Sequence, residues 1–273
     1  MNKEDYFIKQ LSVNKYIGDD GAVINGTVYS MDAFCENVHF KKKWMNLKQI
    51  AKKSMLVNIS DAIAMNAKPK YALLSVAIPK SYTTKELDEL ASGFKSIAKK
   101  YNLHIIGGDT IANDKLDISV TIISKTKYPL YRKGIKEGDF LCYTGHLGES
   151  KRDLDILLNG GKIDKNSRFI KPTLRSEFIY EVRQYLNAGM DISDGLFFEL
   201  ERLSKINNLG YEFLELIPME IGCSGEEYEM VFSFDPKYLK KIESIAKKHK
   251  VKLNIFAKAK MGKFRCDCKA HHF

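Results

Sequence analysis

The sequence predicts a mixed α+β protein with two halves, on the basis of three observations. Segments with strand-like alternation and segments with helical apolar spacing follow one another along the chain. A stretch with four glycines between Gly134 and Gly148 separates them into two groups. The length of 273 residues suits two domains of roughly 100–150 residues each. We therefore expect an N-terminal domain over residues 1–137 and a C-terminal domain over residues 138–273.

The first half begins with a short amphipathic helix over residues 1–15 and a hairpin over residues 22–34. In the hairpin an apolar segment precedes the turn Asn25-Gly26, and strand alternation follows the turn. Residues 46–67 carry apolar and small side chains at helical spacing, which predicts a buried helix with Asp61 on or near one face.

Four further elements complete the first half. A strand over residues 69–79 is closed by Pro79, and an amphipathic helix over residues 83–102 has Thr83 or Thr84 as its N-cap. The segment LHIIGGDTIA then predicts a strand that enters a tight turn at Gly107-Gly108. Residues 116–126 alternate cleanly and predict another strand.

The second half predicts a similar mixture of elements. Residues 131–150 are expected to form a loop, a strand and a glycine-rich turn. The expected elements that follow are a helix at 176–187, a turn running into a helix at 189–207, a strand at 211–219, a turn and strand at 222–235, a helix at 236–250 and a last strand at 252–262.

Composition limits the partners of the chain. The hydrophobic fraction is 44%, and neither a membrane-length apolar run nor a signal-peptide core is found, so we expect a cytoplasmic protein without a membrane partner. The net charge is +10, but the lysines are dispersed and no arginine-rich tract or zinc finger occurs. We therefore expect solvated helix faces, no nucleic-acid partner, and compatibility with small anions.

The five cysteines do not predict a disulfide framework, because their number is odd and most are scattered. Cys266 and Cys268 form a C-x-C pair with His271 and His272 close behind, which could bind a soft metal ion such as zinc. The spacing is not a standard zinc spacing, and a chance grouping at the terminus is the favoured interpretation.

Aspartates at turns and element ends are the main functional signal. They occur in the stretches IGDDGAV, YSMDAF, NISDAIA, IGGDT and MDISDG, mostly beside apolar sequence. One such aspartate is usually a cap, but carboxylates near an apolar core need a positive charge, and few Lys or Arg lie in these stretches. Magnesium prefers oxygen ligands and is shared with phosphates. Neither a P-loop nor a kinase catalytic loop is present, so the residues indicate an uncommon type of Mg²⁺–phosphate enzyme.

Seven stretches make the chain resemble the thiamine-monophosphate kinase family, in the superfamily of aminoimidazole ribonucleotide synthetase. In order they are YIGDDGAV, SMDAFCENVHF, VNISDAIAMNAKP, IIGGDT, YRKGIKEGDFLCYTGHLGES, MDISDGL and SGEEYEMVF, from about Asp19 to Phe232. The resemblance implies a two-domain synthetase-like fold, in which the N-terminal domain pairs in a homodimer and the C-terminal domain is an α/β sandwich. It also implies direct in-line transfer of the γ-phosphoryl group of ATP to thiamine phosphate, giving thiamine diphosphate, with several Mg²⁺ ions and no side-chain nucleophile.

The resemblance also implies roles for particular residues. The expected metal ligands are Asp20, Ser30, Met31, Asp32, Asp61, Asp109, Asp191 and Asp194. The expected ATP contacts are Gly108, Asp109, Arg132 and Ser193. The expected thiamine-phosphate contacts are His39, Glu226 and Phe273. Taken singly, His39 would be a structural histidine, Arg132 a surface side chain, and Ser193 with Asp194 a helix cap.

The chain departs from the family pattern at three positions. Met31 stands where Thr is common: if that Thr binds metal through its backbone carbonyl, Met can replace it, and if it binds through its hydroxyl, one contact is lost. Glu227 replaces an Asp and Asn66 replaces a Gly. The alternatives are another ATP-using member of the superfamily, such as a selenophosphate synthetase or a hydrogenase maturation protein, and a non-catalytic polyanion-binding protein. A selenophosphate synthetase would need a reactive Cys or selenocysteine near the N-terminus, and residues 1–19 contain no Cys.

Overall fold

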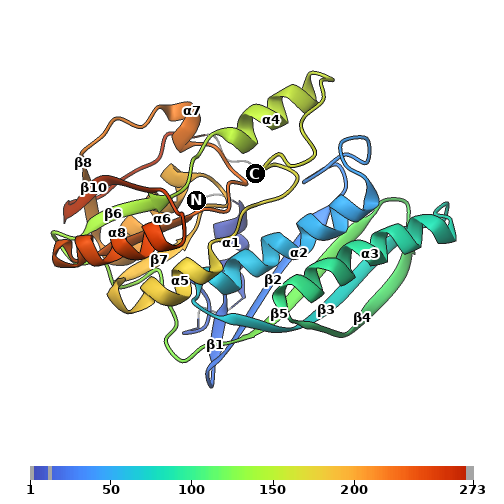
Figure 1. The fold of residues 1–273 in the computed structure, drawn as a ribbon, viewed down its shortest axis with the longest axis horizontal. Helices are drawn as coiled ribbons and strands as arrows, with labels where there is room; N and C mark the ends of the chain where they lie inside the picture. The colour runs from blue at the N-terminus through green and yellow to red at the C-terminus, as the bar shows by residue number, and fades with distance from the viewer. Residues whose placement is uncertain (1–2, 12–13, 269–273) are drawn as a thin grey trace.

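The mixed α+β class is confirmed by the computed structural model, which describes residues 3–11 and 14–268. Within these residues the strands form two five-stranded sheets, in the orders β1-β2-β5-β3-β4 and β7-β9-β6-β10-β8 (Figure 1). The elements are α1 (Lys3–Gln10), β1 (Ala22–Ile24), β2 (Thr27–Cys35), α2 (Leu47–Ala64), β3 (Lys68–Pro79), α3 (Thr84–Tyr101), β4 (His104–Asn113), β5 (Asp117–Lys125), β6 (Phe140–Thr144), α4 (Glu149–Leu158), α5 (Ser176–Val182), η1 (Arg183–Tyr185), β7 (Ala188–Asp191), α6 (Leu196–Asn207), β8 (Leu209–Phe213), α7 (Met219–Gly222), β9 (Met230–Phe234), η2 (Pro236–Tyr238), α8 (Leu239–Lys248) and β10 (Leu253–Met261).

The predicted hairpin forms at the start of the first sheet. Ile24 pairs with Thr27 across the turn, and both turn residues have positive φ, 49° at Asn25 and 71° at Gly26. Two consecutive positive φ angles give a turn whose twist matches that of the flanking strands. The turn therefore sets the register that directs β2 toward the acidic site.

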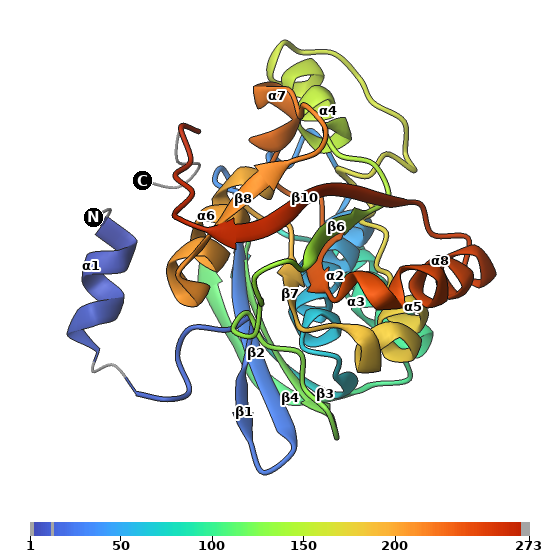
Figure 2. The same ribbon diagram turned by 90° about the vertical axis from the view of Figure 1, so that its left-hand side faces the viewer.

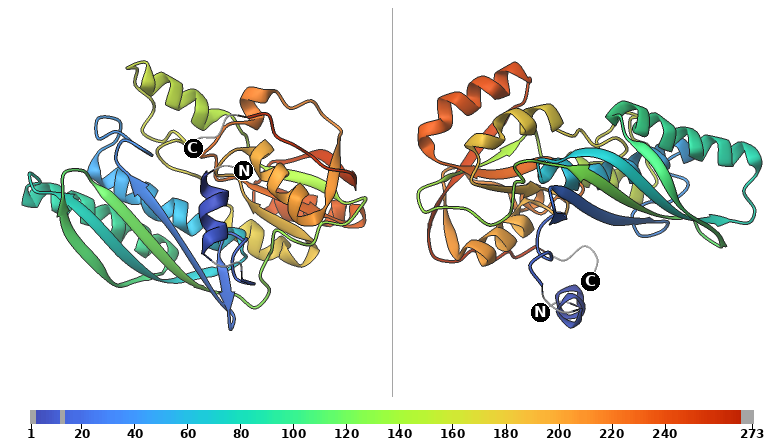
Figure 3. Two further views of the ribbon diagram at one scale, coloured as in Figure 1. Left: turned by 180° about the vertical axis from the view of Figure 1, so that it is seen from behind. Right: turned by 90° about the horizontal axis from the view of Figure 1, so that it is seen from below.

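Helix α2 lies between the two halves of the molecule and packs against both. Its first turn carries a capping box, in which Asn46 accepts from the Gln49 backbone N–H and the Gln49 side chain accepts from Asn46. The helix packs against β2, β5 and α3 of the first half and against β7 and α5 of the second. Because it is covered on several sides, most of its residues are buried, the polar Lys53 and Asn58 among them. Figure 3 shows the helix within the molecule from behind and from below.

The first sheet is covered on only one face. Helices α2 and α3 lie over that face, as Figure 2 shows from the side. On the other face Tyr29, Ile123 and Tyr71 share one row of the register, and the two tyrosines are exposed. Strand β4, at the sheet edge, exposes Ile106 and Ile111. A broad apolar surface therefore remains open in a single chain.

The second half differs from the sequence expectation in several elements. The strand expected at 211–219 ends at Phe213 as β8, and Met219 begins α7. Strand β7 was expected as a turn, but it pairs with β9, with Asp191 opposite Met230. All four of its residues are buried, so the alternation that identifies a half-exposed strand is missing. Helix α4 was not among the expected elements, because it begins after Gly148 without a side-chain cap and so lacks a start signal.

The cysteines also differ from expectation at one place. Cys223 and Cys268 form a disulfide, with Cα atoms 5.6 Å apart, although the sequence had predicted no framework. One bridge between residues 45 positions apart cannot be recognised from an odd number of scattered cysteines. His271 and His272 lie outside the described residues. None of the helices described is both long and apolar enough to cross a membrane.

Candidate metal and nucleotide site

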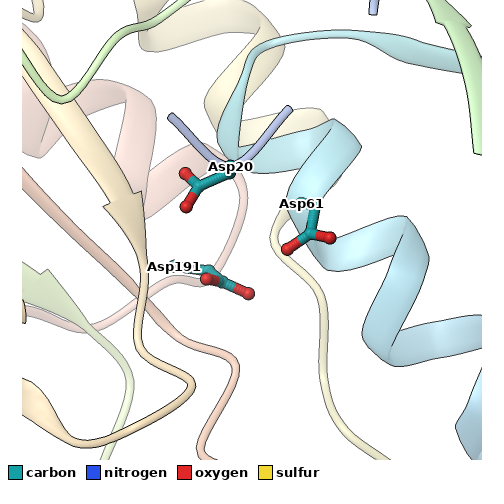
Figure 4. Close-up of side chains that lie close together, drawn as sticks. All are labelled: Asp20, Asp61 and Asp191. Atoms are coloured by element: carbon teal, nitrogen blue, oxygen red, sulfur yellow. The ribbon is translucent and has the colours of Figure 1, made fainter. Parts of the chain in front are cut away.

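Three carboxylates from distant parts of the chain meet between the two halves. Asp20 precedes β1, Asp61 lies near the end of α2, and Asp191 ends β7. One oxygen from each lies within 4.8 Å of the others, and Figure 4 shows the three groups around a common space. The predicted residues of three separate stretches thus lie together.

The electrostatics of this cluster are unfavourable in the absence of a cation. Desolvation raises the pKa of Asp20, and it raises the pKa of Asp61 and Asp191 well above the usual value. Repulsion adds to the effect, from Asp32 and Asp191 on the pKa of Asp61 and from Asp20 on the pKa of Asp191. The opposing charge nearby is Arg132, which lowers these pKa values but not enough to cancel the other effects.

The cluster fits a magnesium ion by its donor set. All three side chains offer hard carboxylate oxygens, which suit Mg²⁺ better than a soft metal ion. The Asp20 side chain is nearly fully buried, and its Oδ2 has no hydrogen-bond partner. Such a buried oxygen is costly unless a positive group approaches it.

Strand β2 brings three more predicted ligands toward the cluster. Asn58 of α2 accepts a hydrogen bond from the Asp32 N–H at 2.7 Å, and its carbonyl accepts from the Ser30 hydroxyl at 3.4 Å. These bonds fix β2 on α2, so that Asp32 is close enough to raise the pKa of Asp61. Met31 lies between them with its side chain exposed, so only its backbone would be suitable as a hard ligand.

Arg132 is bound to the acidic loop in this structure. Its Nε donates to Asp20 Oδ1 at 3.1 Å, its Nη2 forms a second bond with the same oxygen, and its backbone N–H donates to Asp19. The guanidinium therefore holds the loop in place. Its role as an ATP contact stays a prediction.

Ser193 and Asp194 follow β7 at the other side of the cluster. Asp194 forms an ion pair with Arg202 at 2.6 Å, and its backbone N–H donates to Glu199. The Ser193 carbonyl accepts from the Glu226 N–H at 2.6 Å. This backbone bond joins the loop expected to contact ATP to the loop expected to contact the acceptor.

The two expected acceptor residues come from different halves. His39 follows β2, and its Nδ1 accepts from the Cys35 N–H at 2.9 Å. Glu226 lies before β9 and forms an ion pair with Lys53 at 2.9 Å. Phe273, the third expected acceptor residue, lies outside the described residues.

Gly108 and Asp109 lie apart from the cluster, within edge strand β4, which continues through Gly107-Gly108 where a tight turn was expected. Gly108 lies so close to β3 that an added Cβ would be 1.7 Å from the Leu74 carbonyl oxygen. Asp109 shares a register row with Ser75 and Ser119, whereas Asp32 shares the next row, which faces α2. Because successive side chains point to opposite faces, Asp109 faces the uncovered side of the sheet. Its roles as metal ligand and ATP contact stay predictions.

Four polar residues at the site were missed in the sequence. Asn58 holds β2, and Ser60 donates to Asp191 Oδ2. Their position within one turn of Asp61 could have identified them. Lys53 gave no signal among many lysines. Tyr228 was also missed; desolvation raises its pKa well above the usual value, and the nearby Glu226 carboxylate adds to this.

Known proteins share sequence similarity with most of this chain. A family described as AIR synthase related protein, N-terminal domain, matches residues 18–126. The thiamine-monophosphate kinase of Buchnera aphidicola subsp. Schizaphis graminum is 34% identical over 267 residues, which cover 87% of this chain and 82% of that protein. The thiamine-monophosphate kinase of Leptospira interrogans is 30% identical and covers 84% of each chain.

Solved structures show the same fold. The thiamine monophosphate kinase of Aquifex aeolicus aligns with a TM-score of 0.83 at 24% identity, over 96% of this chain and 93% of that one. A structure described as AaThiL complexed with AMPPCP and TMP aligns with a TM-score of 0.82 at 24% identity, over 96% of this chain and 90% of that one. With relatives at 30% identity or more over most of its length, the chain belongs to the thiamine-monophosphate kinase family of enzymes.

Proposed function

We propose that the protein transfers the γ-phosphoryl group of ATP to thiamine phosphate and so forms thiamine diphosphate, the last step of that cofactor's synthesis. The observation that carries the proposal is the Asp20–Asp61–Asp191 cluster, at the boundary between the two halves of a chain of this family. A similar fold is described in complex with AMPPCP, an ATP analogue, and TMP, which we take to be thiamine monophosphate.

The transfer is proposed to be direct and in line. Asp20, Asp61 and Asp191 would hold Mg²⁺, with Ser30, Met31, Asp32 and Asp194 as the further predicted ligands. Bound Mg²⁺ supplies positive charge that offsets the charge on the phosphate oxygens. The chain itself would position the two substrates. Arg132 and Ser193 would contact ATP on one side, and His39 and Glu226 would bind thiamine phosphate on the other.

We also propose that the active form is a homodimer in the cytoplasm, built on an N-terminal domain over residues 1–137 and a C-terminal domain over residues 138–273. The uncovered face of the first sheet supports the dimer, because exposed Tyr29, Tyr71 and Ile111 form an apolar surface. Asp109 faces the same side. A second copy on this face would bring Asp109 and Gly108 toward the interface, where they could serve the partner's nucleotide site.

Phosphorus NMR on the purified protein with ATP, Mg²⁺ and thiamine phosphate tests the reaction. We expect the two diphosphate signals of thiamine diphosphate, absent when Mg²⁺ is chelated and absent with the Asp61→Asn variant. Mg²⁺-dependent ATP binding without thiamine diphosphate would contradict the proposal and indicate a different acceptor. Salt-sensitive polyanion binding without any turnover would indicate a non-catalytic protein.

A further inference from the structure

A buried lysine lies beside the expected acceptor residues and has no part in the proposed mechanism. Lys53, in the middle of α2, is completely buried. Its Nζ lies 3.8 Å from the ring centroid of Phe169 and 5.6 Å from that of Phe34. Desolvation lowers its pKa, and the neighbouring Glu226 carboxylate acts in the opposite direction. A charged group in such a place normally has a partner.

That partner is Glu226 in the other half of the chain. Lys53 Nζ donates to Glu226 Oε2 at 2.9 Å, across 173 positions of sequence. The Glu226 backbone is fixed as well, because its N–H donates to Ser193 and its carbonyl accepts from the Ser150 hydroxyl at 2.8 Å. About a quarter of the Glu226 side chain remains exposed. In the described part of the chain no group donates a hydrogen bond to its second oxygen, Oε1. That oxygen can therefore accept a hydrogen bond from a ligand.

Phe34 connects this ion pair with the other expected acceptor residue. The Phe34 ring stacks on His39, with centroids 5.5 Å apart and an interplanar angle of 24°. The same ring lies near the Lys53 ammonium group. Lys53 therefore contacts both Glu226 and the aromatic support of His39, although these residues belong to different halves of the molecule.

Packing alone does not require an ammonium group at this position. A methionine could fill much of the space between Phe34 and Phe169 without the desolvation penalty of a buried charge. Replacing a buried ion pair with apolar groups is often neutral or stabilising. The charge has a clear use only if the Glu226 carboxylate must be held in one orientation.

We infer that Lys53 is a positioning residue for the acceptor: it holds Oε2 of Glu226, so that Oε1 is presented to an N–H donor of the acceptor's heterocycle. This inference rests on the proposed function. It assigns the ion pair to acceptor binding and leaves ATP binding to the acidic cluster and its neighbours.

The test compares Lys53→Met with Lys48→Met, an exposed lysine on the same helix. Loss of one charge-assisted contact predicts that Lys53→Met raises the KM for thiamine phosphate at least about tenfold. The KM for ATP, and the Kd for ATP with Mg²⁺ measured by calorimetry, should change less than about twofold. Lys48→Met should change neither. Glu226→Gln should likewise raise the KM for thiamine phosphate but not the KM for ATP. In the double variant Lys53→Met/Glu226→Gln, the KM for thiamine phosphate should be no higher than in the more impaired single variant.

Two results would overturn the inference. One is a KM for thiamine phosphate that stays within about twofold of the parent value in Lys53→Met. The other is an equal rise in both KM values with a large fall in Tm, which would indicate a structural role. If Lys53→Met does not fold, Lys53→Leu is compared with Lys48→Met in the same way, because it also removes the ammonium group from Glu226. Failure of the proposed function is distinguishable, because the parent protein would then form no thiamine diphosphate at all.

Discussion

Asp20, Asp61 and Asp191 illustrate how single residues define the chemistry of this protein. Each could be a turn or helix-end acid in isolation. Together they form a partly desolvated cluster in which the pKa of every member is raised, with Arg132 as the cation bonded to it. Such an arrangement stabilises bound divalent cations at the expense of the metal-free protein.

Replacing Asp61 with Asn should separate function from stability. The amide keeps the shape but removes a charged ligand, and a loss of several kcal/mol of transition-state stabilisation predicts turnover at least about a thousandfold lower. The metal-free variant should melt at a higher temperature than the parent, because one repelling carboxylate is gone. Coupled assays and calorimetry measure the two effects, and activity within a few-fold of the parent would contradict the ligand role.

The pH dependence of the metal-free protein should reflect the same residues. The pKa of Asp61 and Asp191 is raised in the folded state, so the folded state binds more protons than the unfolded state above the ordinary pKa of 3.8. Their stabilising contribution is complete below that value and is lost as the pH rises through the raised pKa. In EDTA, the Tm contribution of this cluster should therefore fall as the pH rises above the ordinary pKa of 3.8 and through the raised pKa values of the two carboxyls.

Mg²⁺ should reduce this fall, because a ligand that binds only the folded state stabilises it by mass action. The control is Asp61→Asn, whose Tm should depend less on pH in EDTA. If Tm depended equally on pH in the parent and in the variant, with and without Mg²⁺, the cluster would not be the source of the pH dependence.

At the scale of elements, α2 determines the geometry of the site. It carries Lys53, Asn58, Ser60 and Asp61 and packs against both halves. Strand β2 is bound to it through Asn58, and β7 through Ser60 and Asp191. The position of one helix therefore decides whether the predicted ligands meet.

The start of α2 should be important for stability rather than for catalysis. Asn46→Ala removes the side chain that accepts from the Gln49 N–H, and a lost N-cap typically lowers the free energy of unfolding by about 1 kcal/mol. Urea unfolding measures this change. Asn166→Ala, at an exposed loop position, is the matched control and should change the free energy by less than about 0.5 kcal/mol. An equal effect of both would contradict the role of the cap.

At the scale of the whole molecule, the uncovered face of the first sheet is the most prominent feature. Its opposite face is covered by α2 and α3, whereas Tyr29, Tyr71 and Ile111 remain exposed. A second copy could cover this surface and the edge strand β4 together. Asp109, on the same face, would then lie at the interface.

Ile111→Lys should disrupt this proposed dimer. A lysine within an apolar interface loses hydration, so we expect a monomer in analytical ultracentrifugation and a large loss of turnover. Leu216→Lys, which changes a fully exposed leucine in the second half, should remain dimeric and active. A parent protein that is monomeric and fully active would refute the dimer and the shared role of Asp109.

The sequence alone determined the features that depend on neighbouring residues. The turn at Asn25-Gly26, the buried helix around Asp61 and the cap at Thr83 follow from local periodicity and hydrogen bonding, and the structure confirms them. Family membership followed from ordered motifs along most of the chain. Only the tertiary structure decided that β7 is a buried strand, that Cys223 meets Cys268, and that Lys53 pairs with Glu226. The physical reason is that these contacts join distant segments through packing on α2 and on the second sheet, and no local pattern encodes such contacts.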